Sequence, residues 1–205
     1  MIRAVLFDYE GVVAAKGSHL LSEHLGRNLG IPAKQAWEEL LAPEQHNSLT
    51  GAINETELWQ NIGKRYGKPI DASARDIWHS FEELKLYPEV IAFAEHLRRK
   101  GITAGILSNV ITVTRDSVQS RNGYTGFEPV FLSCEIGFAK PDEAVYEFVL
   151  EKLERKPDEV LFVDDREDNV AAAERLGIYA ILATSPKQVI ADATRLISEL
   201  NGIDL

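Results

Sequence analysis

Five short apolar runs rich in Val, Ile, Leu and Phe recur along the chain. They are continuous rather than alternating with polar residues, which is typical of strands buried on both faces of a parallel sheet. The pattern therefore predicts five strands, at residues 4–7 (AVLF), 103–107 (TAGIL), 129–133 (PVFLS), 159–163 (EVLFV) and 179–183 (YAILA).

Amphipathic stretches separate these runs and predict helices at residues 88–101, 141–154, 169–177 and 185–200. The first of them has basic residues in its last turn and stops at Gly101. The last opens with Ser185 as a cap and Pro186 at the first helical position. Strands and helices that alternate in this way predict an α/β fold with a doubly wound, Rossmann-like parallel sheet.

Residues 15–86 follow a different pattern. No strand-like run is present there, and the segment divides into helical stretches at residues 18–30, 33–42, 54–67 and 73–84. All three tryptophans, Trp37, Trp59 and Trp78, fall within it, and we expect them to form the core of a small helical module. The predicted organisation is an α/β core of residues 1–14 and 87–205, with a small α-helical domain of residues 15–86 inserted after the first strand.

The charge balance limits the partners. The formal net charge is −10 and the pI is near 5.0, so we expect neither a nucleic-acid backbone nor a membrane surface as partner. A phosphate ligand remains compatible, because local donors or a bound cation reverse the sign inside a cleft. No secretory signal opens the chain, no uncharged run is long enough to span a bilayer, and the single Cys134 suits a reducing compartment. We therefore expect a cytoplasmic protein.

Polar side chains follow four of the predicted strands. Directly or after a short loop, the runs lead into Asp8, into Ser108 and Asn109, into Lys140, and into Asp164 and Asp165. Ligands of open parallel sheets bind just beyond the carboxyl ends of the strands. We therefore expect these residues to meet at one edge of the sheet.

The chemistry of this set points to phosphoryl transfer. The three aspartates, with Glu10 nearby, crowd negative charge, and two like charges about 4 Å apart repel by on the order of 4 kcal/mol at an effective dielectric constant near 20. Such a group either takes up protons or binds a hard cation, for which Mg²⁺ with oxygen ligands is the natural choice. Lys140 adds a positive charge, and the Ser108 hydroxyl with the amides after it is suited to hold the oxygens of an anion.

Four segments carry a resemblance to a known family: VLFDYEG (5–11), ILSN (106–109), GFAKP (137–141) and FVDDREDN (162–169). They resemble the four ordered motifs of the haloacid dehalogenase-like (HAD) hydrolase superfamily. The resemblance covers essentially the whole chain, and the helical insertion looks like the cap domain found after the first motif. The third and fourth motifs most resemble small sugar-phosphate phosphatases. The resemblance implies a Mg²⁺-dependent phosphatase that acts on a small phosphorylated metabolite, with a sugar phosphate as one candidate.

Carried over residue by residue, the resemblance implies that Asp8 is a nucleophile, forming an aspartyl-phosphate that water later hydrolyses. Ser108 and the backbone of Asn109 would hold the phosphoryl group. Lys140 would neutralise charge on Asp8 and on the phosphoryl oxygens, and Glu10 would act as general acid and base.

The resemblance also implies a set of metal ligands. Asp165, the Asp8 carboxylate and the Glu10 backbone carbonyl would bind Mg²⁺ directly. Asp164 would bind it directly or through water, and Asn169 would orient their loop.

Glu10 departs from the family pattern, because most phosphatases of the superfamily carry Asp there. Glu keeps the carboxylate but adds a methylene, and the enolase-phosphatase branch also carries Glu at this position. Two alternatives stay open. One is a haloacid dehalogenase, which uses the same aspartate without metal but has Tyr at position 10 and lacks the acids at 164 and 165. The other is a non-catalytic relative that uses the fold for binding. The sequence carries no signal for the specific substrate or the oligomeric state.

Overall fold

The computed structural model of the protein describes residues 1–75, 85–120 and 122–205. Its centre is a five-stranded sheet in the order β3-β2-β1-β4-β5, and every neighbouring pair of strands is parallel. The strands are β1 (Ala4–Phe7), β2 (Thr103–Ser108), β3 (Val130–Leu132), β4 (Val160–Asp164) and β5 (Tyr179–Leu182). The predicted doubly wound α/β fold and all five predicted strands are confirmed.

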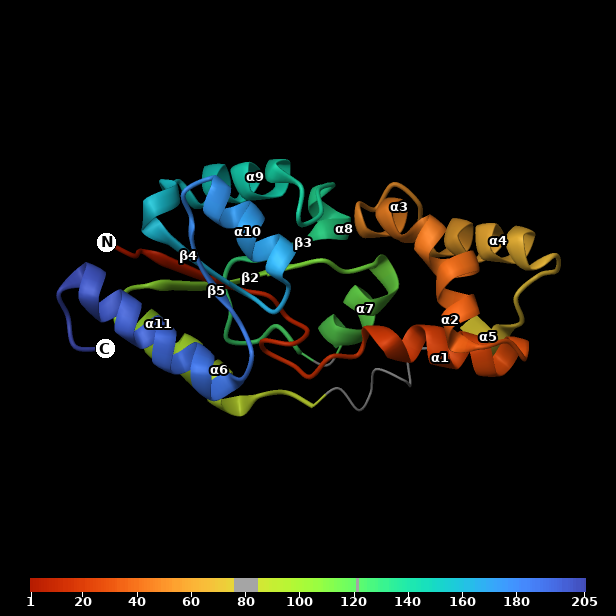
Figure 1. Ribbon diagram of the computed structural model, residues 1–205, viewed down its shortest axis with the longest axis horizontal. Helices are drawn as coiled ribbons and strands as arrows, with labels where there is room; N and C mark the ends of the chain where they lie inside the picture. The colour runs from red at the N-terminus through yellow and green to blue at the C-terminus, as the bar shows by residue number, and fades with distance from the viewer. Residues whose placement is uncertain (76–84, 121) are drawn as a thin grey trace.

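Helices cover both faces of the sheet (Figure 1). One face carries α6 (Pro88–Arg99), α7 (Thr112–Ser120) and α11 (Pro186–Asn201), and the other carries α9 (Glu143–Leu153) and α10 (Glu167–Arg175). A 3-10 turn, Pro157–Glu159, precedes β4, and the short α8 (Ser133–Ile136) follows β3. Neither α7 nor α8 was among the helices predicted from the amphipathic stretches.

Alternation along the strands explains why both faces are apolar. In β1, Val5 and Phe7 pack into the cluster with α6 and α11, while Ala4 and Leu6 pack into the cluster with α9 and α10. The edge strand β5 differs from the prediction of burial on both faces, because only Ile181 of its residues is buried. An edge strand has a neighbour on one side alone, so part of its surface remains exposed.

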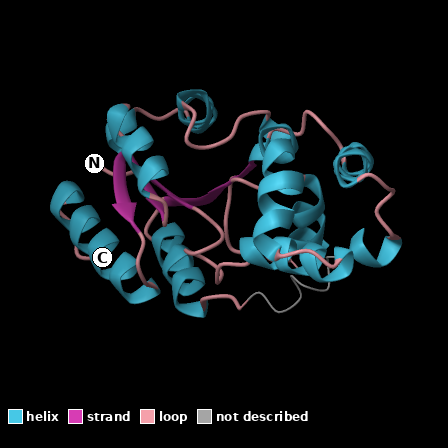
Figure 2. Cartoon of the chain, turned by 45° about the vertical axis from the view of Figure 1, so that its right-hand side comes forward, coloured by secondary structure: helices cyan, strands magenta, loops and turns pink. Residues whose placement is uncertain are grey.

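A separate group of helices lies beside the sheet and contains no strand among its described residues (Figure 2). It consists of α1 (Ser18–Leu29), α2 (Ala33–Gln35), the π-helix η1 (Ala36–Leu41), the 3-10 turn η2 (Ala42–Glu44), α3 (Gln45–Leu49), α4 (Glu55–Tyr66) and α5 (Ala72–Arg75). We call this group the helical insertion. It has its own apolar cluster, which includes Leu25, Leu40, Trp59 and Ile62.

The two tryptophans that the structure describes, Trp37 and Trp59, differ in burial. Trp59 is buried in the helical insertion as predicted, but Trp37 is 38% exposed, so its predicted core position is wrong. Trp37 occupies the first turn of η1, where the neighbouring buried positions are Ala36, Leu40 and Leu41. Trp78 and most of the helix predicted at 73–84 lie outside the described residues.

Two adjacent linkers connect the helical insertion to the sheet. The amide of Ala15 donates to the carbonyl of Lys85, and the amide of Tyr87 donates to the carbonyl of Val13. The insertion also touches the core elsewhere, since α3 packs beside α8 and Ile111 packs against its apolar cluster. Ile111 follows closely after β2, so the insertion lies over the carboxyl edge of the sheet. No helix among the described residues combines the length and apolarity needed to cross a bilayer.

Candidate active site

Four strand ends bring charged and polar side chains to one edge of the sheet. Asp8 follows β1, Ser108 ends β2, Lys140 lies in the loop after α8, and Asp164 ends β4. All four are buried. Because β2, β1 and β4 are parallel neighbours, their carboxyl ends meet at this edge. The side chains of Asp8, Lys140 and Asp164 are therefore brought together, and Ser108 lies at the end of the strand beside β1.

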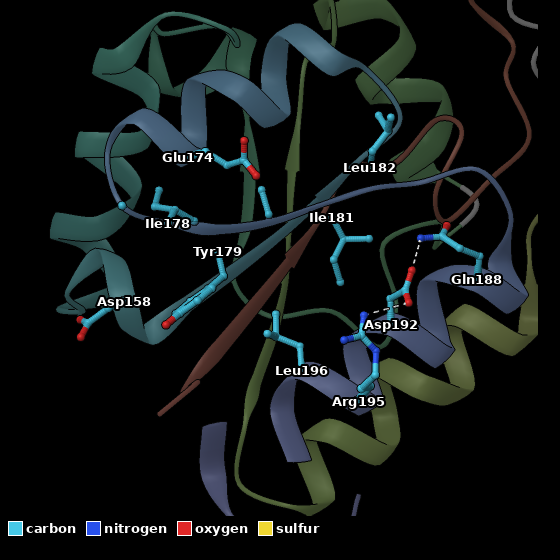
Figure 3. Close-up of a pocket in the computed structure, with 12 residues that line it drawn as sticks. Asp158, Glu174, Ile178, Tyr179, Ile181, Leu182, Gln188, Asp192, Arg195 and Leu196 are labelled. Atoms are coloured by element: carbon cyan, nitrogen blue, oxygen red, sulfur yellow. Dashed lines mark hydrogen bonds and ion pairs between the residues drawn. The ribbon is translucent and has the colours of Figure 1, made fainter. Parts of the chain in front are cut away.

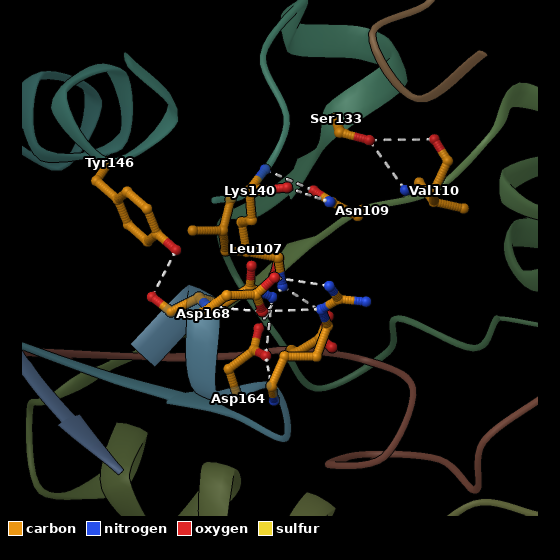
Figure 4. Close-up of polar contacts among 11 residues, drawn as sticks. Leu107, Asn109, Val110, Ser133, Lys140, Tyr146, Asp164 and Asp168 are labelled. Atoms are coloured by element: carbon orange, nitrogen blue, oxygen red, sulfur yellow. Dashed lines mark hydrogen bonds and ion pairs between the residues drawn. The ribbon is translucent and has the colours of Figure 1, made fainter. Parts of the chain in front are cut away.

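Lys140 is the centre of this cluster (Figure 4). Its ammonium nitrogen Nζ lies 2.9 Å from Asp8 Oδ1 and 2.7 Å from Asp164 Oδ2, and it donates to the carbonyl oxygen of Leu107 at 2.8 Å. The side chain is 1% exposed, so water does not screen these charges. Lys140 thus holds two carboxylates from different strands in one place.

The side chain of Asn109 positions Lys140. Its Oδ1 accepts from the backbone amide of Lys140, and its Nδ2 donates to the backbone carbonyl of the same residue, both at 2.8 Å. The loop after Asn109 is held in turn by Ser133, whose hydroxyl accepts from the amide of Val110 and donates to its carbonyl. Asn109 therefore fixes the lysine loop with its side chain, a contact that sequence reasoning missed.

Asp164 has both carboxylate oxygens occupied. Oδ2 accepts from Lys140, and Oδ1 accepts from the backbone amide of Arg166 and from Nδ2 of Asn169, each at 2.9 Å. The Tyr146 hydroxyl donates to the carbonyl of Asn169 at 2.8 Å and supports that turn. Asn169 orients the acidic loop as expected, whereas nothing in the sequence pattern of its helix distinguished Tyr146 from a core residue.

Asp8, Asp164 and Asp165 form a carboxylate cluster, with one oxygen from each lying within 4.8 Å of the others. The donor set fits Mg²⁺, since it consists of oxygens only. Three carboxylates beside one buried ammonium leave two negative charges, which a divalent cation neutralises. The residues present therefore suit the metal that the family resemblance implies.

The titration of the cluster follows from burial and from these charges. Burial raises the pKa of Asp8 from 3.8 to about 6; Lys140 opposes this rise and Asp164 adds to it. Burial alone would lower the pKa of Lys140, but Asp8 and Asp164 more than offset that effect and raise it above 10.5. Burial therefore disfavours the charged form of Asp8, even beside the ammonium of Lys140.

Gly11 lies directly against Asp165. Its φ is +86°, and a Cβ at this position would lie 2.6 Å from the carboxyl carbon of Asp165. Both the left-handed backbone and the close approach therefore require glycine. The sequence predicted the turn, but only the structure reveals the contact.

Two further contacts join the site to the linker that leads into the helical insertion. Oε2 of the half-buried Glu10 accepts from the backbone amide of Gly17 at 3.1 Å. The ammonium of Lys16 forms an ion pair with the carboxylate of Asp165. Lys16 was not among the candidates from sequence, because it stands alone in a linker without a motif.

A hollow lies away from the carboxylate cluster, on another part of the sheet (Figure 3). It has a volume of about 670 Å³ and runs along the edge strand β5 beside α11, and none of the clustered carboxylates lines it. Three of its polar groups pair with one another, since Gln188 donates to Asp192, which also accepts from Arg195. The charged groups at the carboxyl edge, rather than this hollow, define the candidate site.

Known proteins with a similar sequence identify the family of the chain. Residues 2–177 match the family model described as haloacid dehalogenase-like hydrolase. Bifunctional epoxide hydrolase 2 of Rattus norvegicus is 36% identical over 220 residues, covering 98% of this chain and 39% of that protein. Glyceraldehyde 3-phosphate phosphatase of Methanopyrus kandleri is 29% identical over 196 residues, covering 88% of this chain and 83% of that one. The chain spans only 11% to 39% of the length of several other curated relatives that it matches.

Solved structures agree on the fold. A protein of Porphyromonas gingivalis, described as a predicted HAD-like family hydrolase, superimposes with a TM-score of 0.77 at 25% identity. The match covers 96% of this chain and 98% of that chain.

Proposed function

Because the chain belongs to the haloacid dehalogenase-like hydrolase family, we propose that it is a Mg²⁺-dependent phosphatase acting on a small phosphomonoester through an aspartyl-phosphate. The observation that carries the proposal is the buried contact of Lys140 with Asp8 and Asp164, with Asp165 beside them. A sugar phosphate is one candidate substrate, which the similarity to a glyceraldehyde 3-phosphate phosphatase supports.

In the first step, a carboxylate oxygen of Asp8 attacks phosphorus, and the bond between phosphorus and the substrate oxygen breaks. Glu10 donates a proton to the leaving alcohol. In the second step, Glu10 takes a proton from water, which attacks phosphorus. The bond between phosphorus and the Asp8 oxygen then breaks, releasing inorganic phosphate and restoring the carboxylate.

Other side chains stabilise the charge of the phosphoryl group. The Lys140 ammonium neutralises Asp8 and the phosphoryl oxygens, while the Ser108 hydroxyl and the Asn109 backbone amide donate to those oxygens. The side chain of Asn109 is already engaged in holding Lys140, so its backbone is the part left for substrate.

Asp165, the Asp8 carboxylate and the Glu10 backbone carbonyl are the proposed direct ligands of Mg²⁺. Asp164 is proposed to act through water, because Lys140, Asn169 and the Arg166 amide already occupy its oxygens. When bound, the cation would neutralise charge on the phosphoryl oxygens.

The helical insertion is proposed to act as a substrate-selecting cap of residues 15–86 on a core of residues 1–14 and 87–205. Its support is a separate apolar cluster, two adjacent linkers, and contacts near Ile111 close to the carboxyl edge of the sheet. A lid over the site would exclude water and contact the part of the substrate that does not react.

The test is release of inorganic phosphate from a panel of phosphorylated metabolites, with and without Mg²⁺, alongside halide release from 2-haloacids. We expect metal-dependent phosphate release, and a loss of about a thousandfold or more in Asp8→Asn because the nucleophile is removed. Unchanged turnover in that variant would exclude a covalent role for Asp8. Metal-independent halide release would instead favour the dehalogenase alternative, and no turnover of either class would favour a binding protein.

Glu10 is tested within the same assay. Glu10→Asp should retain or raise turnover, whereas Glu10→Gln should lower it by about a hundredfold because the proton donor is lost. The opposite order would remove Glu10 from the acid and base role.

A further inference from the structure

Lys16 occupies a position that the proposed reaction does not use. Its ammonium is paired with the Asp165 carboxylate, yet its side chain is 64% exposed while that of Asp165 is 9% exposed. Lys140 differs in both respects, since it is 1% exposed and contacts Asp8, Asp164 and the Leu107 carbonyl. Lys140 is therefore built into the core, whereas Lys16 reaches the cluster from solvent.

The ammonium of Lys16 and a divalent cation would use the same carboxylate. Asp165 carries a single negative charge, and the Lys16 ammonium and a bound Mg²⁺ would repel each other if both contacted it. With Lys16 in place, one of the two uncompensated negative charges of the cluster is already neutralised. When the Lys16 ammonium moves away from Asp165, the cluster again has two uncompensated negative charges, which balance the two positive charges of Mg²⁺.

We propose that Lys16 is a displaceable counter-ion of the metal site, which lowers the affinity for Mg²⁺ and is released into solvent when the cation binds. The inference rests on the proposed metal site and adds to it a residue from the linker. Release costs little on the lysine side because its largely exposed ammonium is already partly hydrated, and the arriving cation neutralises the Asp165 carboxylate that it leaves. Since Lys16 adjoins Gly17, whose amide donates to Glu10, metal binding removes a contact between this linker and the site.

The first experiment measures the dissociation constant of Mg²⁺ by calorimetry on the metal-free protein. Lys16→Gln should bind Mg²⁺ about two- to fivefold more tightly than the wild type, and Lys16→Arg, which keeps the charge, should not. Lys156→Gln is the matched control, because it makes the same charge change at the opposite, amino end of β4. The difference in Mg²⁺ affinity between Lys16→Gln and the wild type should decrease as the salt concentration rises, because salt screens the ion pair of Lys16 with Asp165.

The second experiment follows the amine itself. Acetylation of Lys16, read by mass spectrometry, should become faster when Mg²⁺ is added, while that of Lys156 should stay constant. Equal or weaker Mg²⁺ binding by Lys16→Gln, or an unchanged acetylation rate, would overturn the role of Lys16 and leave the phosphatase proposal intact. If neither the wild type nor Lys16→Gln bound Mg²⁺, the metal site itself would be excluded, and both proposals with it.

Discussion

The α/β core and the helical insertion both bury charge, but in different arrangements. In the insertion, Glu44 is buried and accepts from Asn61 and Arg65, two residues of the single helix α4. In the core, Asp8 and Asp164 come from different strands and share Lys140 from a third segment.

The difference lies in how the charge is balanced. Among the described residues, Glu44 is paired with the guanidinium of Arg65 and the side-chain amide of Asn61, so its charge is neutralised within the insertion. The core places three carboxylates together with one buried ammonium, which leaves negative charge for a ligand to neutralise. Burial of a charged side chain is therefore weak support for a functional site, whereas convergence of unbalanced charge from remote segments is strong support.

The largest expected effect on Mg²⁺ binding comes from Gly11→Ala, which disturbs the core cluster without changing its charge. The added Cβ would displace the Asp165 carboxylate, so Mg²⁺ binding should weaken about tenfold or more. The positive φ should also lower the free energy of unfolding by about 1–2 kcal/mol. Calorimetric Mg²⁺ titration and chemical denaturation measure the two effects.

Gly30→Ala is the matched control for that experiment. Gly30 also has a positive φ, +69°, but nothing lies within 4 Å of an added Cβ. It should share the loss of stability and keep normal Mg²⁺ binding. Equal loss of binding in both variants would show that the contact with Asp165 is unimportant.

The next effect is the pH dependence that Asp8 imposes on the metal-free protein. The pKa of Asp8 is about 6 in the folded protein and near 3.8 in the unfolded chain, so the folded state binds this proton more tightly. The resulting stabilisation is fully present below about pH 4 and is lost as the pH rises through about 6, on the order of 2–3 kcal/mol. The difference between the melting temperature of the wild type and that of Asp8→Asn should therefore decrease as the pH rises from about 4 to about 7.

Adding Mg²⁺ at neutral pH should restore the wild-type melting temperature and leave that of Asp8→Asn nearly unchanged. A constant difference between the two proteins across this pH range would contradict the burial of an unbalanced carboxylate at position 8.

The smallest effect is expected in the insertion, where charge is balanced. Glu44→Ala leaves Asn61 and the half-exposed Arg65 without their acceptor and should lower the free energy of unfolding by about 1–2 kcal/mol. Glu38→Ala, at a mostly exposed acid 3.8 Å from Lys34, should change it by less than about 0.5 kcal/mol. Mg²⁺ affinity should be unchanged in both, and a change in Glu44→Ala would mean that the insertion supports the metal site.

Much of the fold could be predicted from the local pattern of apolar and polar residues. Strands buried on both faces leave continuous apolar runs, so β1, β2 and β4 were recognisable without any knowledge of their partners. The edge strand β5 and the π-helical η1 were less well predicted, because exposure at an edge and the pitch of a helix depend on what packs against them.

The amino-acid sequence alone determined which acids and which lysine stand at strand ends, since each directly follows an apolar run or lies in a recognisable motif. Only the tertiary structure decided how they are paired. The side chain of Asn109 hydrogen-bonds the backbone of Lys140, Gly11 lies against Asp165, and Lys16 forms an ion pair with Asp165. These contacts join residues that are remote along the chain, so no local periodicity encodes them. They arise when the parallel strands bring their carboxyl ends to one edge of the sheet.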